Sequence, residues 1–292
     1  GAHVECVWRL DDQHLGGLHQ GAFWSYPYSF WLSREMNLLA ANLVEQFYSL
    51  IWPLLRISAF LTFASIYSIR AVNLRVRITL ALVLTIFLVL QLRLDLPKID
   101  PLTVEGLREI FNQLFIGFTM ALIMQLATAS VVVAGQAVSN SMGLSIANMI
   151  DPTLGSVPLT SQFFTILGTL IFVSTGGDLI VFGILLDSFQ YFPIGKTMFS
   201  QDLMGKMISW SSIVFVGSVL VSLPVMITLL FVNVGLGFVT RAAPSLNIFS
   251  VGFPAMMFTG FLVLWLAIPS ILSRIDWLWV QTFNSMRAMM HP

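Results

Sequence analysis

A long apolar stretch without charge is the feature that most limits what this chain can fold into. Between Ile110 and Ile150 the sequence has no Asp, Glu, Lys or Arg. Further apolar stretches lie at about 38–69, 78–92, 161–189, 207–240 and 253–273. Strands of a membrane barrel are about ten residues long and alternate in polarity, whereas these stretches are longer and unbroken. They predict α-helices, and we expect an all-α membrane protein.

The composition agrees with a membrane location and removes several classes of function. Hydrophobic residues make up 57% and charged residues 10% of the chain, against about 45–50% and 25% in an ordinary soluble domain. With 14 basic and 14 acidic side chains and no net charge, the chain lacks the basic face that nucleic-acid binding requires. The single cysteine excludes an internal disulfide, a thiolate zinc site and an iron–sulfur cluster. We expect no metal and no other cofactor.

The apolar stretches do not fit six simple membrane spans. The stretch 78–92 would cover only about 22 Å as a helix, short of the roughly 30 Å hydrocarbon core. The stretches 110–150 and 207–240 would each form one over-long helix or two helices joined by a tight turn. Breaks or kinks are predicted inside the apolar stretches at Pro53, Pro224, Pro269 and Gly176-Gly177. Broken backbone at membrane depth must be satisfied by protein or by a water-filled cavity, which predicts packing against partner subunits.

Basic residues stand on both sides of the short stretch 78–92. They lie at Arg70, Arg75 and Arg77 before it and at Arg93, Lys98 and Arg108 after it. The positive-inside rule expects them on one side of a span. Either the stretch is a re-entrant hairpin, or ordinary topology rules do not position this protein.

Residues 1–35 differ from the rest of the chain. They contain the only cysteine, Cys6, and three of the four histidines, and they show neither a helical nor an alternating pattern. They also lack the order of regions that marks a signal peptide. We expect 1–35 to be an upstream extension and Met36 to be the native start, so that 36–292 forms the folded domain. The alternative is a genuine N-terminal arm.

Two polar, Gly- and Pro-marked motifs interrupt the apolar pattern. Residues 139–158 read SNSMGLSIANMIDPTLGSVP, a predicted loop too apolar to be a solvated linker. It is either a gate or plug in a pore, or a loop that packs on its own helices. Residues 241–254 read RAAPSLNIFSVGFP, where Pro244 and Pro254 bracket a segment that we interpret as a structural turn.

Isolated ionisable residues lie within the apolar surroundings. They are Glu45, Arg56, Asp178, Asp187 and Arg241. No Asp/Glu/His chain that could relay a proton connects them, so we expect structural pairing between helices. No HExxH, GxSxG, Walker or GxGxxG motif is present, and no enzymatic activity is supported.

Three long motifs occur in an order that resembles a known family. They are AGQAVSNSMGLSIANMIDP, FVSTGGDLIVFGILLDSFQYFPIG and RAAPSLNIFSVGFP. Together they resemble the FliR family of flagellar biosynthetic proteins and its counterparts in virulence type III secretion. The resemblance extends from Met36 to about Met290.

The resemblance implies a non-enzymatic component of the flagellar type III export gate, located in the bacterial cytoplasmic membrane at the flagellar basal body. Its partners would be FliP, FliQ, FlhB and other export components, with membrane lipid around them and unfolded flagellar proteins as transported substrate. Its fold would consist of tilted, broken helical hairpins packed into a hetero-oligomeric ring.

The resemblance also implies which residues form the gate. The loop that plugs the closed channel in the family corresponds to about 139–160 here. The candidate plug residues are Asn140, Met142, Gly143, Leu144, Ile146, Met149, Asp151 and Pro152. The candidate structural motif residues are Gly135, Gln136, Pro244, Asn247 and Phe249. Two other functions stay open at this point: a secondary transporter of a small solute, and a scaffold that nucleates FliP and FliQ.

Overall fold

The computed structural model describes residues 48, 50–67, 73–92, 99–144, 158–195, 201–242 and 252–290. All of them belong to Tyr48–Pro292, the second of the two units into which the chain divides. Every regular element within these ranges is a helix, without a strand, which confirms the all-α fold class. The predicted extension 1–35 lies outside the described residues and stays a prediction.

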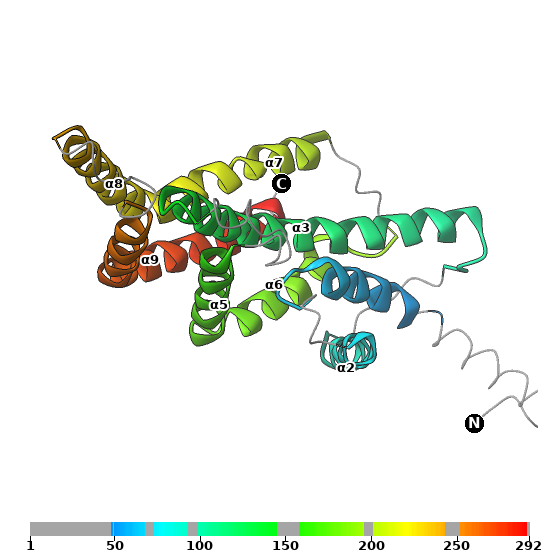
Figure 1. Cartoon of the computed structure of the whole chain (residues 1–292). Coiled ribbons are helices and arrows are strands. Elements are labelled where there is room, and N and C mark those ends of the chain that lie inside the picture. The colour runs from blue at the N-terminus through cyan, green and yellow to red at the C-terminus, as the bar shows by residue number, and fades with distance from the viewer. Residues whose placement is uncertain are drawn as a thin grey trace, which may run out of the picture. The chain divides into compact units, whose positions relative to one another are not determined.

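Eight helices are described within these ranges (Figure 1). They are Leu50–Phe63, α2 (Leu74–Leu92), α3 (Val104–Ser141), α5 (Leu159–Ser174), α6 (Gly177–Tyr191), α7 (Gln201–Ser211), α8 (Ile213–Ala242) and α9 (Phe253–Met290). Three helical stretches in the described part of the chain are long and apolar enough to cross a membrane, and the bent pair α5–α6 would make a fourth. Several helices of this chain are therefore long enough to span a membrane.

Helix α3 is one over-long helix as far as Ser141. It begins where the Thr103 hydroxyl accepts a hydrogen bond from the Gly106 amide at 3.1 Å, a side-chain cap that satisfies an otherwise unpaired donor. Its 38 residues correspond to about 57 Å at the usual helical rise. No proline interrupts it, so the single-helix alternative for this part of the sequence is the correct one.

The stretch 207–240 also favours the single over-long helix, because it lies in the helical span Met204–Val239, in which one turn residue, Ser212, separates α7 from α8. Of the breaks or kinks predicted at Pro224 and Pro269, the breaks are excluded, because α8 and α9 continue through these prolines. A proline removes only one helical hydrogen bond, and intact turns on both sides hold the helix. Helix α2 is likewise uninterrupted over its 19 residues, so the stretch 78–92 is not a hairpin.

The predicted interruption at Gly176 is confirmed. Helix α5 ends at Ser174 and α6 begins at Gly177, with a bend of 68° between them (Figure 1). Gly176 has φ of 67° and ψ of 29°, a left-handed conformation that glycine adopts without the steric cost that a Cβ brings. The backbone itself therefore sets the direction of α6.

Helix α3 is the central helix of the fold, because it packs against α5, α7, α8 and α9. Its Gly117 lies so close to Leu50–Phe63 that a Cβ there would collide with the Arg56 carbonyl. On another side of the core, the Trp279 indole of α9 donates a hydrogen bond to the Gly168 carbonyl of α5 at 3.0 Å. Close backbone contact and one buried aromatic hydrogen bond thus fix helices that are distant in sequence.

Arg56 joins three parts of the fold in a buried polar network. Its side chain is fully buried and donates to Gln113 of α3 at 2.7 Å. It also donates to the Ser188 carbonyl at 2.9 Å and the Phe192 carbonyl at 2.8 Å, at the end of α6. Gln113 in turn donates to the buried carboxylate of Glu109 at 2.6 Å. The expected structural pairing is therefore confirmed for Arg56.

Candidate functional site

The first end of the predicted loop is a helix end closed by Gly143. The Leu144 amide donates to the Ser139 carbonyl and the Gly143 amide to the Asn140 carbonyl, both at 3.1 Å. Gly143 has φ of 78°. These two bonds around a left-handed glycine form a Schellman motif, which satisfies carbonyls that a helix end leaves unpaired. Gly143 therefore has a structural role in ending α3.

The predicted loop 139–158 begins later than expected, whereas its end agrees with the prediction. Residues 139–141 still belong to α3, and α5 begins at Leu159. The polar, Gly- and Pro-marked composition suggested a loop here, but the Ser141 hydroxyl donates to the Ala137 carbonyl at 2.9 Å inside the helix. Nothing stops the helix until the left-handed Gly143, so Gly135, Gln136 and the exposed Asn140 are helical.

Met142 is anchored in the core of its own chain. The side chain is fully buried and lies directly over Gly260 of α9. A Cβ built at Gly260 would lie 2.6 Å from Cε and 2.7 Å from Cγ of Met142, separations that real Cβ contacts do not show. The absence of a side chain at Gly260 thus provides the space that Met142 occupies.

The second end of the predicted loop is locked onto α3. The Thr160 hydroxyl donates to the Gly135 carbonyl at 2.8 Å, and the Ser161 hydroxyl donates to the Val132 carbonyl at 3.1 Å. A Cβ at Gly135 would lie 2.5 Å from the Cα of Ser161. The start of α5 therefore rests on the backbone of α3 near the point where α3 ends.

These contacts define a rigid base from which the loop leaves. We call Gly135, Met142, Thr160, Ser161 and Gly260 the loop base. Of the candidate plug residues, Leu144 is half-buried and packs on the core. Ile146, Met149, Asp151 and Pro152 lie outside the described residues, as do the motif residues Pro244, Asn247 and Phe249.

Sequence reasoning missed three members of the loop base: Thr160, Ser161 and Gly260. Gly260 lies inside a long apolar helix, where glycine costs about 1 kcal/mol relative to alanine. Such a glycine marks close packing at some positions only: at Gly183 of α6 and Gly235 of α8 a Cβ would meet no atom within 4 Å. A helical glycine also does not say which neighbour approaches, so it could not have pointed to Met142.

A broad apolar surface is exposed over α8 and the first half of α9. Its most exposed members are Phe215, Leu230, Phe231, Phe238, Phe258, Trp265 and Leu266. Soluble monomers rarely expose contiguous apolar patches of more than a few hundred Å². This surface is therefore suited to contact with lipid or with other subunits.

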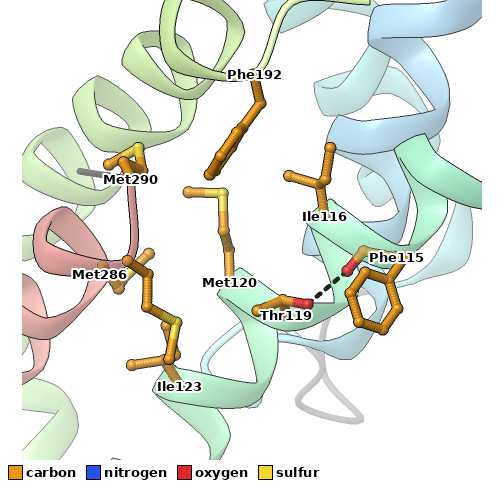
Figure 2. Close-up of a pocket in the computed structure, with 9 residues that line it drawn as sticks. Phe115, Ile116, Thr119, Met120, Ile123, Phe192, Met286 and Met290 are labelled. Carbon is orange, nitrogen blue, oxygen red and sulfur yellow. Dashed lines mark hydrogen bonds between the residues drawn. The ribbon is translucent and has the colours of Figure 1, made fainter. Parts of the chain in front are cut away.

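A small apolar cavity of about 20 Å³ lies between α3, Phe192 and the last turns of α9. Figure 2 shows Met120 and Phe192 directed into it, with Met286 and Met290 on the opposite wall. The Thr119 hydroxyl on its wall donates within α3 to the Phe115 carbonyl at 2.7 Å. The lining offers deformable methionine packing and is unsuited to a polar ligand. Among the described residues, no three His, Cys, Asp or Glu side chains are grouped to hold a metal ion.

Comparison with known proteins identifies the family. The family model described as bacterial export proteins, family 1, matches residues 47–282. The chain is also 33% identical over 244 residues to the flagellar biosynthetic protein FliR of Pectobacterium carotovorum subsp. carotovorum, covering 83% of this chain and 92% of that protein. The chain belongs to the FliR family of bacterial export proteins.

Other FliR proteins match over similar lengths. The FliR of Escherichia coli (strain K12) is 30% identical, with 80% of this chain and 89% of that protein covered. The FliR of Bacillus subtilis (strain 168) is 27% identical, with 85% of this chain and 97% of that protein covered. FliR membership and the long apolar helices make the chain a membrane-embedded component of the flagellar export apparatus.

Proposed function

We propose that this chain forms, together with FliP and FliQ, the channel through which unfolded flagellar proteins cross the cytoplasmic membrane at the basal body. We further propose that its loop between Gly143 and Pro158 plugs the closed channel. The observation that carries the plug proposal is the loop base. Its contacts hold the two helices that flank the loop, while the loop itself lies between the capped end of α3 and the start of α5.

A fixed base suits a gate that must be both tight and openable. Opening can then be confined to the loop, since α3 and α5 do not need to separate. The loop carries apolar residues such as Ile146, Met149 and Leu154, which would exclude water and ions from a closed pore. We expect a barrier of a few kcal/mol, because moving a two-state equilibrium from 1:99 to 99:1 takes about 5.5 kcal/mol.

The exposed apolar surface of α8 and α9 supports assembly with other subunits. Phe231 and Trp265 expose 73% and 68% of their surface in the isolated chain. Both lie in helices of high hydropathy, so this exposed surface is apolar. FliP and FliQ, with FlhB nearby, are the partners we propose for such surfaces, and lipid covers the remainder. We assign the chain no catalytic role.

The plug is tested by removing residues 145–152 while keeping the loop base. The shortened chain is expressed with FliP and FliQ, and ion leakage through the resting complex is measured in cells or proteoliposomes. A control variant replaces the same residues with Gly and Ser, which preserves the length and removes the apolar side chains. Both variants should leak more than the wild type, because the closed loop no longer excludes ions.

The same experiment separates the plug from the scaffold alternative. If both variants co-purify with FliP and FliQ but leak no more than the wild type, the loop is not a plug and a scaffold role is favoured. If the wild-type chain does not co-purify with FliP and FliQ at all, the proposed channel complex is wrong. Membership of an export family already favours protein export over small-solute transport.

A further inference from the structure

The contact between Met142 and Gly260 joins the start of the loop to a distant helix. Met142 is the last residue before the capping Gly143, and Gly260 lies two turns into α9. The Met142 Cε, Cγ and Sδ atoms would lie 2.6, 2.7 and 3.2 Å from a Cβ at Gly260. Three atoms of one side chain therefore fill the space that any larger residue at Gly260 would need.

We propose that Gly260 is a positioning residue for the loop: it forms the seat in which Met142 anchors the capped end of α3. This inference rests on the proposed plug function, because the loop leaves the helix immediately after Met142. The seat couples the loop to α9, since a shift of α9 relative to α3 moves Met142 and with it the point where the loop departs.

The chemistry of Met142 and Gly260 suits a close contact between α3 and α9. A buried methionine is unbranched and polarizable, so it adapts to an irregular gap. The glycine costs helix stability, and the close contact with a fully buried side chain provides a reason for its presence. Gly205 in α7 is a useful contrast, because it is exposed and a Cβ there would meet no atom within 4 Å.

The test adds a methyl group at Gly260 and, in a second step, removes the Met142 side chain that this methyl group would contact. Gly260→Ala, Met142→Ala and the double variant are made in the full chain expressed with FliP and FliQ. Gly205→Ala is the matched control. The background carries Cys6→Ser and Leu144→Cys, because the half-buried Leu144 directly follows the cap. The rate of maleimide labelling at position 144 then reports whether the loop start is still seated.

We expect Gly260→Ala to raise the labelling rate at least fivefold, since overpacking penalties of about 1–3 kcal/mol correspond to roughly 5- to 150-fold changes in a two-state population. Adding Met142→Ala should return the rate to within about twofold of the Met142→Ala value, because the new methyl group then has space. Gly205→Ala should leave the rate unchanged. If Gly260→Ala does not accumulate, recovery of the complex by Met142→Ala is the equivalent supporting result.

The proposed role of Gly260 is refuted if Gly260→Ala assembles and is labelled at the wild-type rate. It is also refuted if adding Met142→Ala does not lower the raised labelling rate of Gly260→Ala. These results are independent of the plug itself. If Gly260→Ala changes the labelling rate but the loop deletion causes no ion leakage, the role of Gly260 is retained and the plug is rejected. If the loop deletion leaks ions but Gly260→Ala leaves the labelling rate unchanged, the plug is retained and the role of Gly260 is rejected.

Discussion

Replacing Arg56 by leucine should strongly destabilise the fold. The substitution removes the donors to Gln113 and to the carbonyls of Ser188 and Phe192. It also leaves the buried Glu109 carboxylate without the nearby cation. Arg56 reaches Glu109 through Gln113, so the estimate rests on the hydrogen bonds that are lost. A hydrogen bond from a charged donor contributes about 1.5–3 kcal/mol. Because bonds to at least two other parts of the fold are lost together, we expect a loss of at least about 3 kcal/mol.

Thermal unfolding in detergent measures this loss. A change of 1 kcal/mol shifts Tm by about 2–4 °C in a domain of 150–250 residues, so the expected decrease is at least about 6 °C. Arg75→Leu is the control, because Arg75 is exposed on the first turn of α2, and it should change Tm by less than about 2 °C.

A second substitution tests the electrostatic part of the reasoning. In the double variant Arg56→Leu/Glu109→Leu, neither buried charge is left alone, so its loss should be smaller than the sum of the two single losses. The reasoning is refuted if Arg56→Leu unfolds within about 2 °C of the wild type, or if the two losses simply add.

Three further substitutions test individual contacts by the same measurement. Gly135→Ala should destabilise by about 1–3 kcal/mol, because the new methyl group forces α3 and α5 apart; an unchanged Tm would contradict the close contact. Gly176→Ala should cost about 1–2 kcal/mol through its left-handed backbone, whereas Gly183→Ala, where a Cβ meets nothing within 4 Å, should be neutral or stabilising; equal effects would argue against the strain. Trp279→Phe should cost about 1–3 kcal/mol because the buried Gly168 carbonyl loses its donor, and retention of wild-type stability would show that the bond contributes nothing.

Local signals predicted the helical fold and the bend between α5 and α6. Long apolar stretches form helices in a membrane because the backbone hydrogen bonds must be satisfied within the segment. Gly176 marks the bend because glycine adopts a left-handed conformation at little cost. At Pro224 and Pro269 the same reasoning allowed a break or a kink. The break does not occur, because the loss of one hydrogen bond does not stop a helix held on both sides by intact turns and by packing.

The candidate site was predicted in part. The Gly- and Pro-marked composition correctly indicated a connection around Gly143, because that glycine ends α3. The start of the loop was placed too early, since Ser and Asn residues that favour turns can also remain helical when the backbone hydrogen bonds continue. The roles of Thr160 and Gly260 depend on which helices touch, which no local pattern contains.

The sequence by itself determined a set of apolar helices, the position of their breaks at glycine and a long apolar connection between two of them. Only the tertiary structure decided which faces meet. Arg56 bonds groups that are 57 and 132 positions away, and Met142 is seated on a glycine of another helix. Helices that are apolar on every side carry no periodic signal of the face that turns inward, so their rotation and crossing are decided by packing alone.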